Sequence, residues 1–163
     1  MVTAATISKE NIWKILEQVV DPEIPVLTIS DLGIIRDVKL NGDEVEVIIT
    51  PTYTGCPAMD MIAMNIKLAL IENGYLKIKI TSVLAPAWTT DWMTEAGKRK
   101  LKEYGIAPPH FTTWSDGASD QIIECPQCNS VKTRLISEFG STACKALYQC
   151  DDCKEPFDYF KCH

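Results

Sequence analysis

Residues 125–153 read CPQCNSVKTRLISEFGSTACKALYQCDDC, with a Cys-x-x-Cys motif at each end. Each motif places two thiols on one tight turn. The residues between the motifs predict a β-hairpin, with strands over 133–139 and 143–148 and a turn at Gly140-Ser141. The hairpin would bring the two turns together, so that four thiolates surround one tetrahedral metal ion. We therefore predict a zinc-ribbon β domain with four metal ligands: Cys125, Cys128, Cys150 and Cys153.

The expected ion at this site is structural zinc. A closed set of four thiolates leaves no coordination position for a substrate, and a segment of about 40 residues obtains most of its folding free energy from the metal. Iron, held as in rubredoxin, is the alternative, because the same four sulfurs accept it. A thioredoxin-like redox role is disfavoured, since no βαβ pattern surrounds the first motif and the second motif engages its thiols.

Three other residues are candidates for a secondary metal or thiol site: Cys144, Cys162 and His163. Cys144 has the strand parity of Ala146 and Tyr148, which predicts a small apolar side chain packed inside the hairpin. Cys162-His163 could replace one ligand or belong to a second, labile metal site, because thiolate and imidazole both suit soft or borderline metals.

The composition of the 163 residues is that of a globular protein, with 46% hydrophobic and 23% charged residues. The 22 acidic residues outnumber the 16 basic ones, and the net charge of -6 argues against a nucleic-acid partner. No stretch approaches the roughly 20 apolar residues of a membrane span, and residues 1–9 lack the regions of an export signal. We expect a cytoplasmic protein with no membrane partner, whose seven cysteines are metal ligands or reactive thiols.

The residues before the ribbon predict a small α+β two-layer sandwich with the order helix-strand-strand-helix-strand-helix. Ser8 can cap a helix that ends at Asp21-Pro22, and Asn41-Gly42 between two alternating apolar segments is typical of a β-hairpin. Pro57 suits the start of a second helix, and alternation over 76–80 predicts a third strand.

Uneven cysteine spacing indicates where the domains divide, since Cys56 is the single cysteine before position 125. The last helix of the sandwich would be capped by Thr90 and end at Tyr104. The segment after it is rich in Pro, Gly, Ser and Thr without sustained periodicity, which is typical of a linker. The predicted parts are an α+β domain, a linker and the ribbon, over residues 1–106, 107–121 and 122–163.

Cys56 stands between Gly55 and Pro57 at the predicted entrance to a helix. There the helix dipole and the unpaired backbone N–H groups would favour the thiolate and lower the pKa of the thiol. The alternative is a cysteine that only packs at the helix start. One thiol cannot hold an iron–sulfur cluster by itself, but two copies in a homodimer, or one copy plus the thiols of a client protein, could hold one transiently.

Candidates for catalytic residues are scarce. The two histidines, His110 and His163, lie in the predicted linker and at position 163, and no nucleophile has a base close to it in sequence. Asp21, Glu23 and Asp31 lie in turn-forming contexts, where carboxylates bind backbone N–H groups. We therefore expect that the protein is not an enzyme.

Four short motifs together carry a resemblance to a known family. They are DPEIP, SDLGII, TYTGCP and APAW, at residues 21–25, 30–35, 52–57 and 85–88. Over residues 8–106 the chain resembles the small α+β domain family used in iron–sulfur cluster assembly. With the ribbon and the segments EFGSTACKA and FKCH, the whole chain resembles the D-protein (PaaD-like) family of phenylacetate degradation.

This resemblance implies an accessory of phenylacetyl-CoA epoxidase, a multicomponent oxygenase whose reductase carries flavin and a [2Fe-2S] cluster. It implies maturation of the oxygenase metal centre by iron–sulfur cluster assembly or transfer, with the oxygenase and reductase components and other assembly factors as partners. Cys56 matches the family's reactive cysteine, and the four ribbon cysteines match its ligands. Residues 85–88 have Ala where many relatives have a second Pro, which leaves the partner undefined. Two alternatives are a non-catalytic scaffold subunit of the oxygenase and a rubredoxin-like electron-transfer protein.

Overall fold

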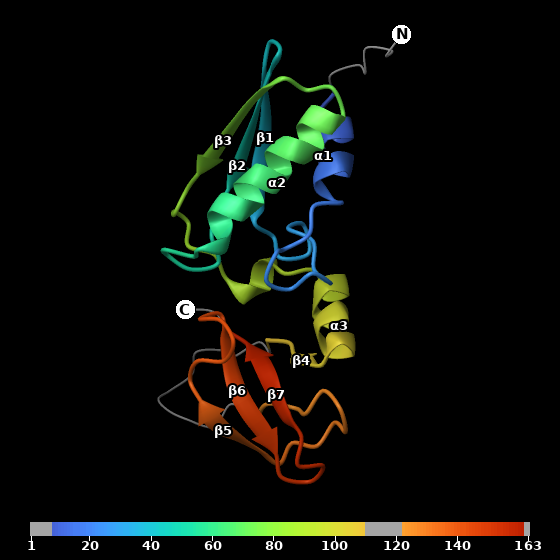
Figure 1. The fold of residues 1–163 in the computed structure, drawn as a ribbon, viewed down its shortest axis with the longest axis vertical. Helices are drawn as coiled ribbons and strands as arrows, with labels where there is room; N and C mark the ends of the chain where they lie inside the picture. The colour runs from blue at the N-terminus through green and yellow to red at the C-terminus, as the bar shows by residue number, and fades with distance from the viewer. Residues whose placement is uncertain (1–7, 110–121, 162–163) are drawn as a thin grey trace. The chain divides into compact units, whose positions relative to one another are not determined.

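In a computed structural model of the protein, residues 8–109 and 122–161 are described. The chain divides into two compact units, Met1–Thr94 and Glu95–His163, and each contains one β-sheet (Figure 1). The predicted α+β class and the order helix-strand-strand-helix-strand-helix are confirmed. Cys162, His163 and most of the predicted linker lie outside the described residues.

The first unit is a two-layer sandwich of helices on a three-stranded sheet (Figure 1). Its elements are α1 (Lys9–Leu16), β1 (Ile35–Asn41), β2 (Glu44–Ile49), α2 (Ala58–Glu72) and β3 (Lys77–Ser82). β1 and β2 form the predicted antiparallel hairpin, and β3 joins β2 in parallel after the crossover through α2. The strand order is therefore β1-β2-β3, with β2 in the centre.

The core of this unit lies between the helices and the sheet. Val45, Val47 and Ile49 alternate along β2 and are buried. Glu46 has the opposite parity, and on that face its carboxylate accepts a hydrogen bond from Thr81 and pairs with a lysine of β3. The helices contribute buried aliphatic side chains: Ile12, Leu16, Ile62, Ile66 and Leu70. Each such side chain stabilises the fold by roughly 1.5–3 kcal/mol, so the contact between the two layers is the main source of stability.

The first helix begins as predicted and ends earlier. The Ser8 side chain accepts a hydrogen bond from the N–H of Asn11 at 3.2 Å, which caps α1. After Leu16 the N–H of Val19 bonds to the carbonyl three residues before it, and Val20 then pairs with Thr28 in an isolated bridge. The helix therefore ends at Leu16, because its continuation is replaced by turns that lead into the bridge.

The segment around Trp88 packs onto the loop that contains Asp31 and Gly33. The indole Nε1 of Trp88 donates to the carbonyl oxygen of Leu32 at 2.7 Å, and Trp88 is buried. Gly33 has a φ of 68°, and a Cβ at this position would lie 2.3 Å from the carbonyl oxygen of Trp92. Only glycine fits here without a shift of the backbone.

The last helix of the predicted order begins later than the sequence indicates. Thr90 opens a 3₁₀ turn, η1 (Thr90–Trp92), and α3 (Glu95–Tyr104) follows after extended backbone. Between them, Thr94 donates its N–H to the carbonyl oxygen of Asp31 at 2.9 Å and its hydroxyl to the Asp31 carboxylate at 3.1 Å. These long-range bonds hold Thr94 outside the helix.

The second unit contains a four-stranded sheet with the order β4-β7-β6-β5. Its strands are β4 (Ile106–Ala107), β5 (Thr133–Ser137), β6 (Lys145–Cys150) and β7 (Pro156–Phe160). β5 and β6 form the predicted antiparallel hairpin, whereas β4 and β7 are additions that the sequence did not predict. A small buried core joins sheet and cysteine turns: Ala107, Ile123, Cys125, Ala146, Cys150, Phe157 and Tyr159.

Among the helices of the described residues, none combines the length and the apolar character that crossing a membrane requires.

Candidate functional site

Cys56 lies in the turn that leads from β2 into α2. Its N–H donates to the carbonyl oxygen of Tyr53 at 3.3 Å, and Gly55 has a φ of 81°, in the left-handed region that glycine tolerates. Pro57 has helical backbone angles and directly precedes the first residue of α2. The turn leaves Cys56 partly exposed.

The surroundings of the Cys56 thiol shift its pKa upward, whereas the sequence predicts a downward shift. Burial is the largest effect and raises the pKa of Cys56 above its ordinary value. Hydrogen bonds from the Ala58 N–H and from Tyr53 lower the pKa, and the charges of Glu23 and Asp21 raise it. The predicted lowering by the helix start is therefore wrong in direction, because burial and two carboxylates outweigh the backbone donors. At neutral pH the Cys56 side chain is mainly a thiol.

The two aspartates of the predicted turns have structural roles, as expected. One carboxylate oxygen of Asp21 accepts hydrogen bonds from the N–H groups of Glu23 and Ile24, both at 2.8 Å. The carboxylate of Asp31 accepts from the Thr28 N–H at 3.0 Å, in addition to its bond with Thr94. Both side chains are buried, and these bonds hold the loops that precede β1.

The four predicted ribbon cysteines converge on one point. The distance between the Sγ atoms of Cys125 and Cys153 is 3.7 Å, and that between Cys128 and Cys150 is 3.5 Å. All four Sγ atoms lie within 4.8 Å of one another. A tetrahedral ion with metal–sulfur bonds of about 2.3 Å separates its ligands by about 3.8 Å. The four sulfurs therefore fit a tetrahedral thiolate site for zinc or iron.

The two cysteine turns repeat the same backbone design. The residue after the second cysteine of each motif has a positive φ, 60° at Asn129 and 66° at Lys154. In the first turn the Cys125 N–H donates to the carbonyl oxygen of Ser130, and in the second the Cys150 N–H donates to that of Glu155. The repeated turn aims both cysteines of each motif at the same point.

The thiols of this cluster perturb one another strongly. Backbone N–H groups, that of Cys153 first, lower the pKa of Cys150 to about 7. The Glu155 N–H lowers the pKa of Cys153, but burial and the neighbouring thiols together raise it to about 12. Four thiolates this close repel one another, so a bound cation is what allows all of them to deprotonate.

Of the other C-terminal candidates, Cys144 lies among the described residues, and it does not belong to this cluster. Cys144 is buried, as its strand parity predicts, and its Sγ lies 3.1 Å from the Thr142 hydroxyl. It is not among the four clustered cysteines. Cys162 and His163 lie outside the described residues, so their role remains a prediction.

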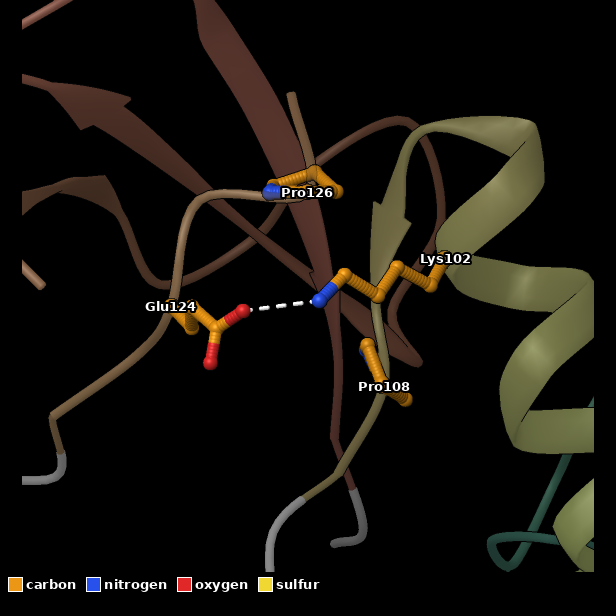
Figure 2. Close-up of a pocket in the computed structure, with 4 residues that line it drawn as sticks. All are labelled: Lys102, Pro108, Glu124 and Pro126. Carbon is orange, nitrogen blue, oxygen red and sulfur yellow. Dashed lines mark hydrogen bonds and ion pairs between the residues drawn. The ribbon is translucent and has the colours of Figure 1, made fainter. Parts of the chain in front are cut away.

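Exposed ion pairs surround the cluster. Arg134 and Lys132 pair with Asp151 and Asp152 of the second cysteine turn, each at 3.5 Å. On the same unit, Lys102 of α3 bonds to Glu124 at 2.7 Å in a small pocket that two prolines complete (Figure 2). These pairs are exposed to solvent, and each contributes about 1 kcal/mol or less.

Sequence reasoning did not identify two neighbours of Cys56, namely Tyr53 and Glu23. Tyr53 lies three residues before the thiol, but nothing in the sequence shows that its side chain turns back to bond to it. Glu23 reaches the thiol through the fold, from the loop after α1.

Family models match both parts of the chain. The model described as iron-sulfur cluster assembly protein matches residues 9–74. The model described as PaaD zinc beta ribbon domain matches residues 111–161. The two matches contain Cys56 and the four ribbon cysteines, respectively.

Similar proteins cover either the whole chain or its first part. The chain is 50% identical over 162 residues to the D component of the putative 1,2-phenylacetyl-CoA epoxidase of Escherichia coli (strain K12), which covers 99% of this chain and 98% of that protein. It is 39% identical over 95 residues to an Fe-S protein maturation auxiliary factor of Bacillus subtilis (strain 168), and this match covers 57% of this chain and 92% of that protein.

A solved structure of a domain of unknown function from Bacillus anthracis is also similar. It is 28% identical to this chain, with a TM-score of 0.54, and the match covers 57% of this chain and 90% of the chain in that structure. Identity along the whole chain, together with the two domain matches, establishes the family. The chain belongs to the PaaD family of phenylacetyl-CoA epoxidase components, with an iron–sulfur cluster assembly domain followed by a PaaD zinc ribbon.

Proposed function

We propose that the protein is a maturation factor that assembles or transfers iron–sulfur clusters for a phenylacetyl-CoA epoxidase, and that it does not oxidise the ring itself. Its clients would be the oxygenase and reductase components, and its donors other assembly factors in the reducing cytoplasm. The observation that carries this proposal is a partly exposed cysteine, Cys56, on the turn into α2 of an iron–sulfur assembly domain. A relative of this domain is named as an Fe-S protein maturation auxiliary factor.

In this proposal Cys56 acts as a temporary ligand to the cluster, which is cargo. Iron displaces the proton of the thiol, and the raised pKa means that the empty site keeps that proton. The client's thiolates then replace the cluster's ligands one at a time, and Cys56 takes a proton again. The exchange leaves the oxidation state of the iron unchanged. Because one cysteine offers a single ligand, the cluster is held weakly and can be passed on.

We propose that the four-cysteine site of the ribbon holds structural zinc. Its closed thiolate set leaves no position for a substrate, and Cys125 and Cys150 are fully buried in the core of the second unit. The ion would stabilise the ribbon. The edge strand β5 exposes Leu135 and Ile136, and Phe139 follows it, so this ribbon has apolar surface for docking a component of the oxygenase.

Anaerobic reconstitution tests the role of Cys56. With a small added thiol that supplies the remaining ligands, the wild-type protein is expected to bind iron and sulfide beyond the metal of the ribbon, with charge-transfer absorption in the visible range. Cys56→Ser is expected to lose that additional iron and to keep the ribbon metal. Cys144→Ser is the matched control, because Cys144 is buried outside the cluster. Equal additional iron in the wild type and Cys56→Ser would remove Cys56 from the mechanism.

The rubredoxin-like alternative rests on the same four sulfurs, because they also accept iron. It predicts a red protein whose iron is lost with Cys125→Ser and is independent of Cys56. One zinc ion in a colourless protein purified without air contradicts it.

A further inference from the structure

The surface of α2 that faces away from the sheet carries a row of apolar side chains beside the charged residues Asp60, Lys67 and Glu72. Four of its side chains are about half exposed: Met61 at 53%, Met64 at 53%, Leu68 at 50% and Ile71 at 48%. The opposite side of the same helix provides the buried residues Ala58, Ile62, Ile66 and Leu70. A surface helix normally places polar residues on the side that faces away from its core, so a row of four apolar residues there is unusual. We call the four exposed residues the α2 stripe.

The neighbouring helix α1 shows that the stripe is not a general property of this layer. α1 belongs to the same helical layer as α2 (Figure 1). Its exposed positions carry Glu10 and Lys14, with Glu17 following at its end, which is the usual polar surface of an amphipathic helix. We therefore expect a partner to cover the stripe on α2.

The spacing of the stripe identifies the partner as another helix. Its residues follow one another at intervals of three, four and three, which is the pattern of a seam between two packed helices. This pattern reads the same in both directions. An antiparallel copy of α2 would place Met61 opposite Ile71 and Met64 opposite Leu68, so that every apolar residue meets an apolar residue.

We propose that the protein forms a two-fold homodimer in which the α2 stripes of the two copies pack against each other as antiparallel helices. The four residues are a small part of the roughly 20–30 residues, or about 800 Å², that each partner of a standard interface contributes. The residues that flank the seam would supply the remainder. Such an interface is small, so we expect a dissociation constant in the micromolar range, about 1–100 μM.

This arrangement has a consequence for Cys56, which lies at the N-terminal end of α2. In the register of this seam Cys56 lies ten positions before the centre, so the two Cys56 residues of an antiparallel pair lie about 30 Å apart along the helix axis. The two Cys56 thiols of such a dimer cannot share one cluster. Each would work alone with the thiols of a client, so the dimer does not depend on the proposed transfer function.

Sedimentation equilibrium of the full chain tests the dimer. The wild type is expected to be dimeric at high concentration, and Leu68→Lys is expected to weaken dimerisation by at least roughly a hundredfold, because it buries a charge in an apolar seam. Val131→Lys is the matched control, since Val131 is also an exposed apolar residue, at 59%, and lies in the other unit. It should leave the dimer intact. Circular dichroism confirms that each variant is folded.

Mixing two variants tests the antiparallel register. Met64→Glu and Leu68→Lys are each expected to be monomeric, whereas an equimolar mixture restores a heterodimer, because position 64 of one copy opposes position 68 of the other. A monomeric wild type at all concentrations overturns the proposal, and so does a dimer that survives Leu68→Lys. A monomeric wild type would mean that a client protein or the chain's own second unit covers the stripe.

Discussion

Gly33 and Gly42 make a matched pair for testing how tightly the SDLG loop is packed. Both have a positive φ, 68° and 66°. A Cβ added to Gly33 lies 2.3 Å from the carbonyl oxygen of Trp92, whereas a Cβ added to Gly42 has no atom within 4 Å. The left-handed backbone costs an alanine about 1 kcal/mol at either position. Overpacking adds about 1–3 kcal/mol at Gly33, because the obstructing atoms include backbone.

The expected free energies of unfolding follow from these terms. Gly42→Ala should destabilise the first unit by about 1 kcal/mol and Gly33→Ala by about 2–4 kcal/mol. For a unit of this size, 1 kcal/mol corresponds to roughly 4–8 °C in Tm. Thermal unfolding followed by tryptophan fluorescence is suited to the measurement, because Trp13, Trp88 and Trp92 belong to the first unit. Equal losses of Tm in the two variants would refute the close packing of Gly33 against Trp92.

Three further predictions concern the thiols and the metal. Chelation of the ribbon metal, or Cys125→Ser, should abolish hydrogen-exchange protection in β5, β6 and β7. The helix α2 should stay protected, since the two units have separate cores. Loss of protection in both units contradicts this prediction. Cys144→Ser should leave the metal content unchanged, because Cys144 lies outside the cluster; metal analysis that finds a deficit would make it a ligand. Alkylation of Cys56 should be slow at pH 7 and accelerate as the pH rises past the ordinary pKa of a thiol. Tyr53→Phe should shift this pH profile to higher pH, because it removes a hydrogen bond that lowers the pKa of Cys56. Full reactivity of Cys56 at pH 7 contradicts the raised pKa.

Elements with strong local signals were predictable from the sequence. Asn41-Gly42 fixed the hairpin of β1 and β2, and Gly55 with Pro57 marked the start of α2. The four ribbon cysteines were predictable as one site because two Cys-x-x-Cys turns joined by a hairpin have few ways to arrange their thiols.

Features that depend on distant contacts were not predictable. The start of α3 is set by bonds between Thr94 and Asp31, which are 63 residues apart in sequence. The strand β4 has two residues and exists through its pairing with β7. The pKa of Cys56 is raised by burial and by carboxylates from the loop after α1, whereas the sequence displays only the local helix start.

Cluster transfer to a client distinguishes a maturation factor from a scaffold. Anaerobically reconstituted protein is mixed with the apo-form of the oxygenase reductase, and the recovery of the reductase's [2Fe-2S] spectrum is followed over time. The proposal predicts rapid recovery with the wild type and with Cys144→Ser, and recovery with Cys56→Ser that is no faster than with free iron and sulfide. Transfer by Cys56→Ser at the rate of the wild type would contradict the account.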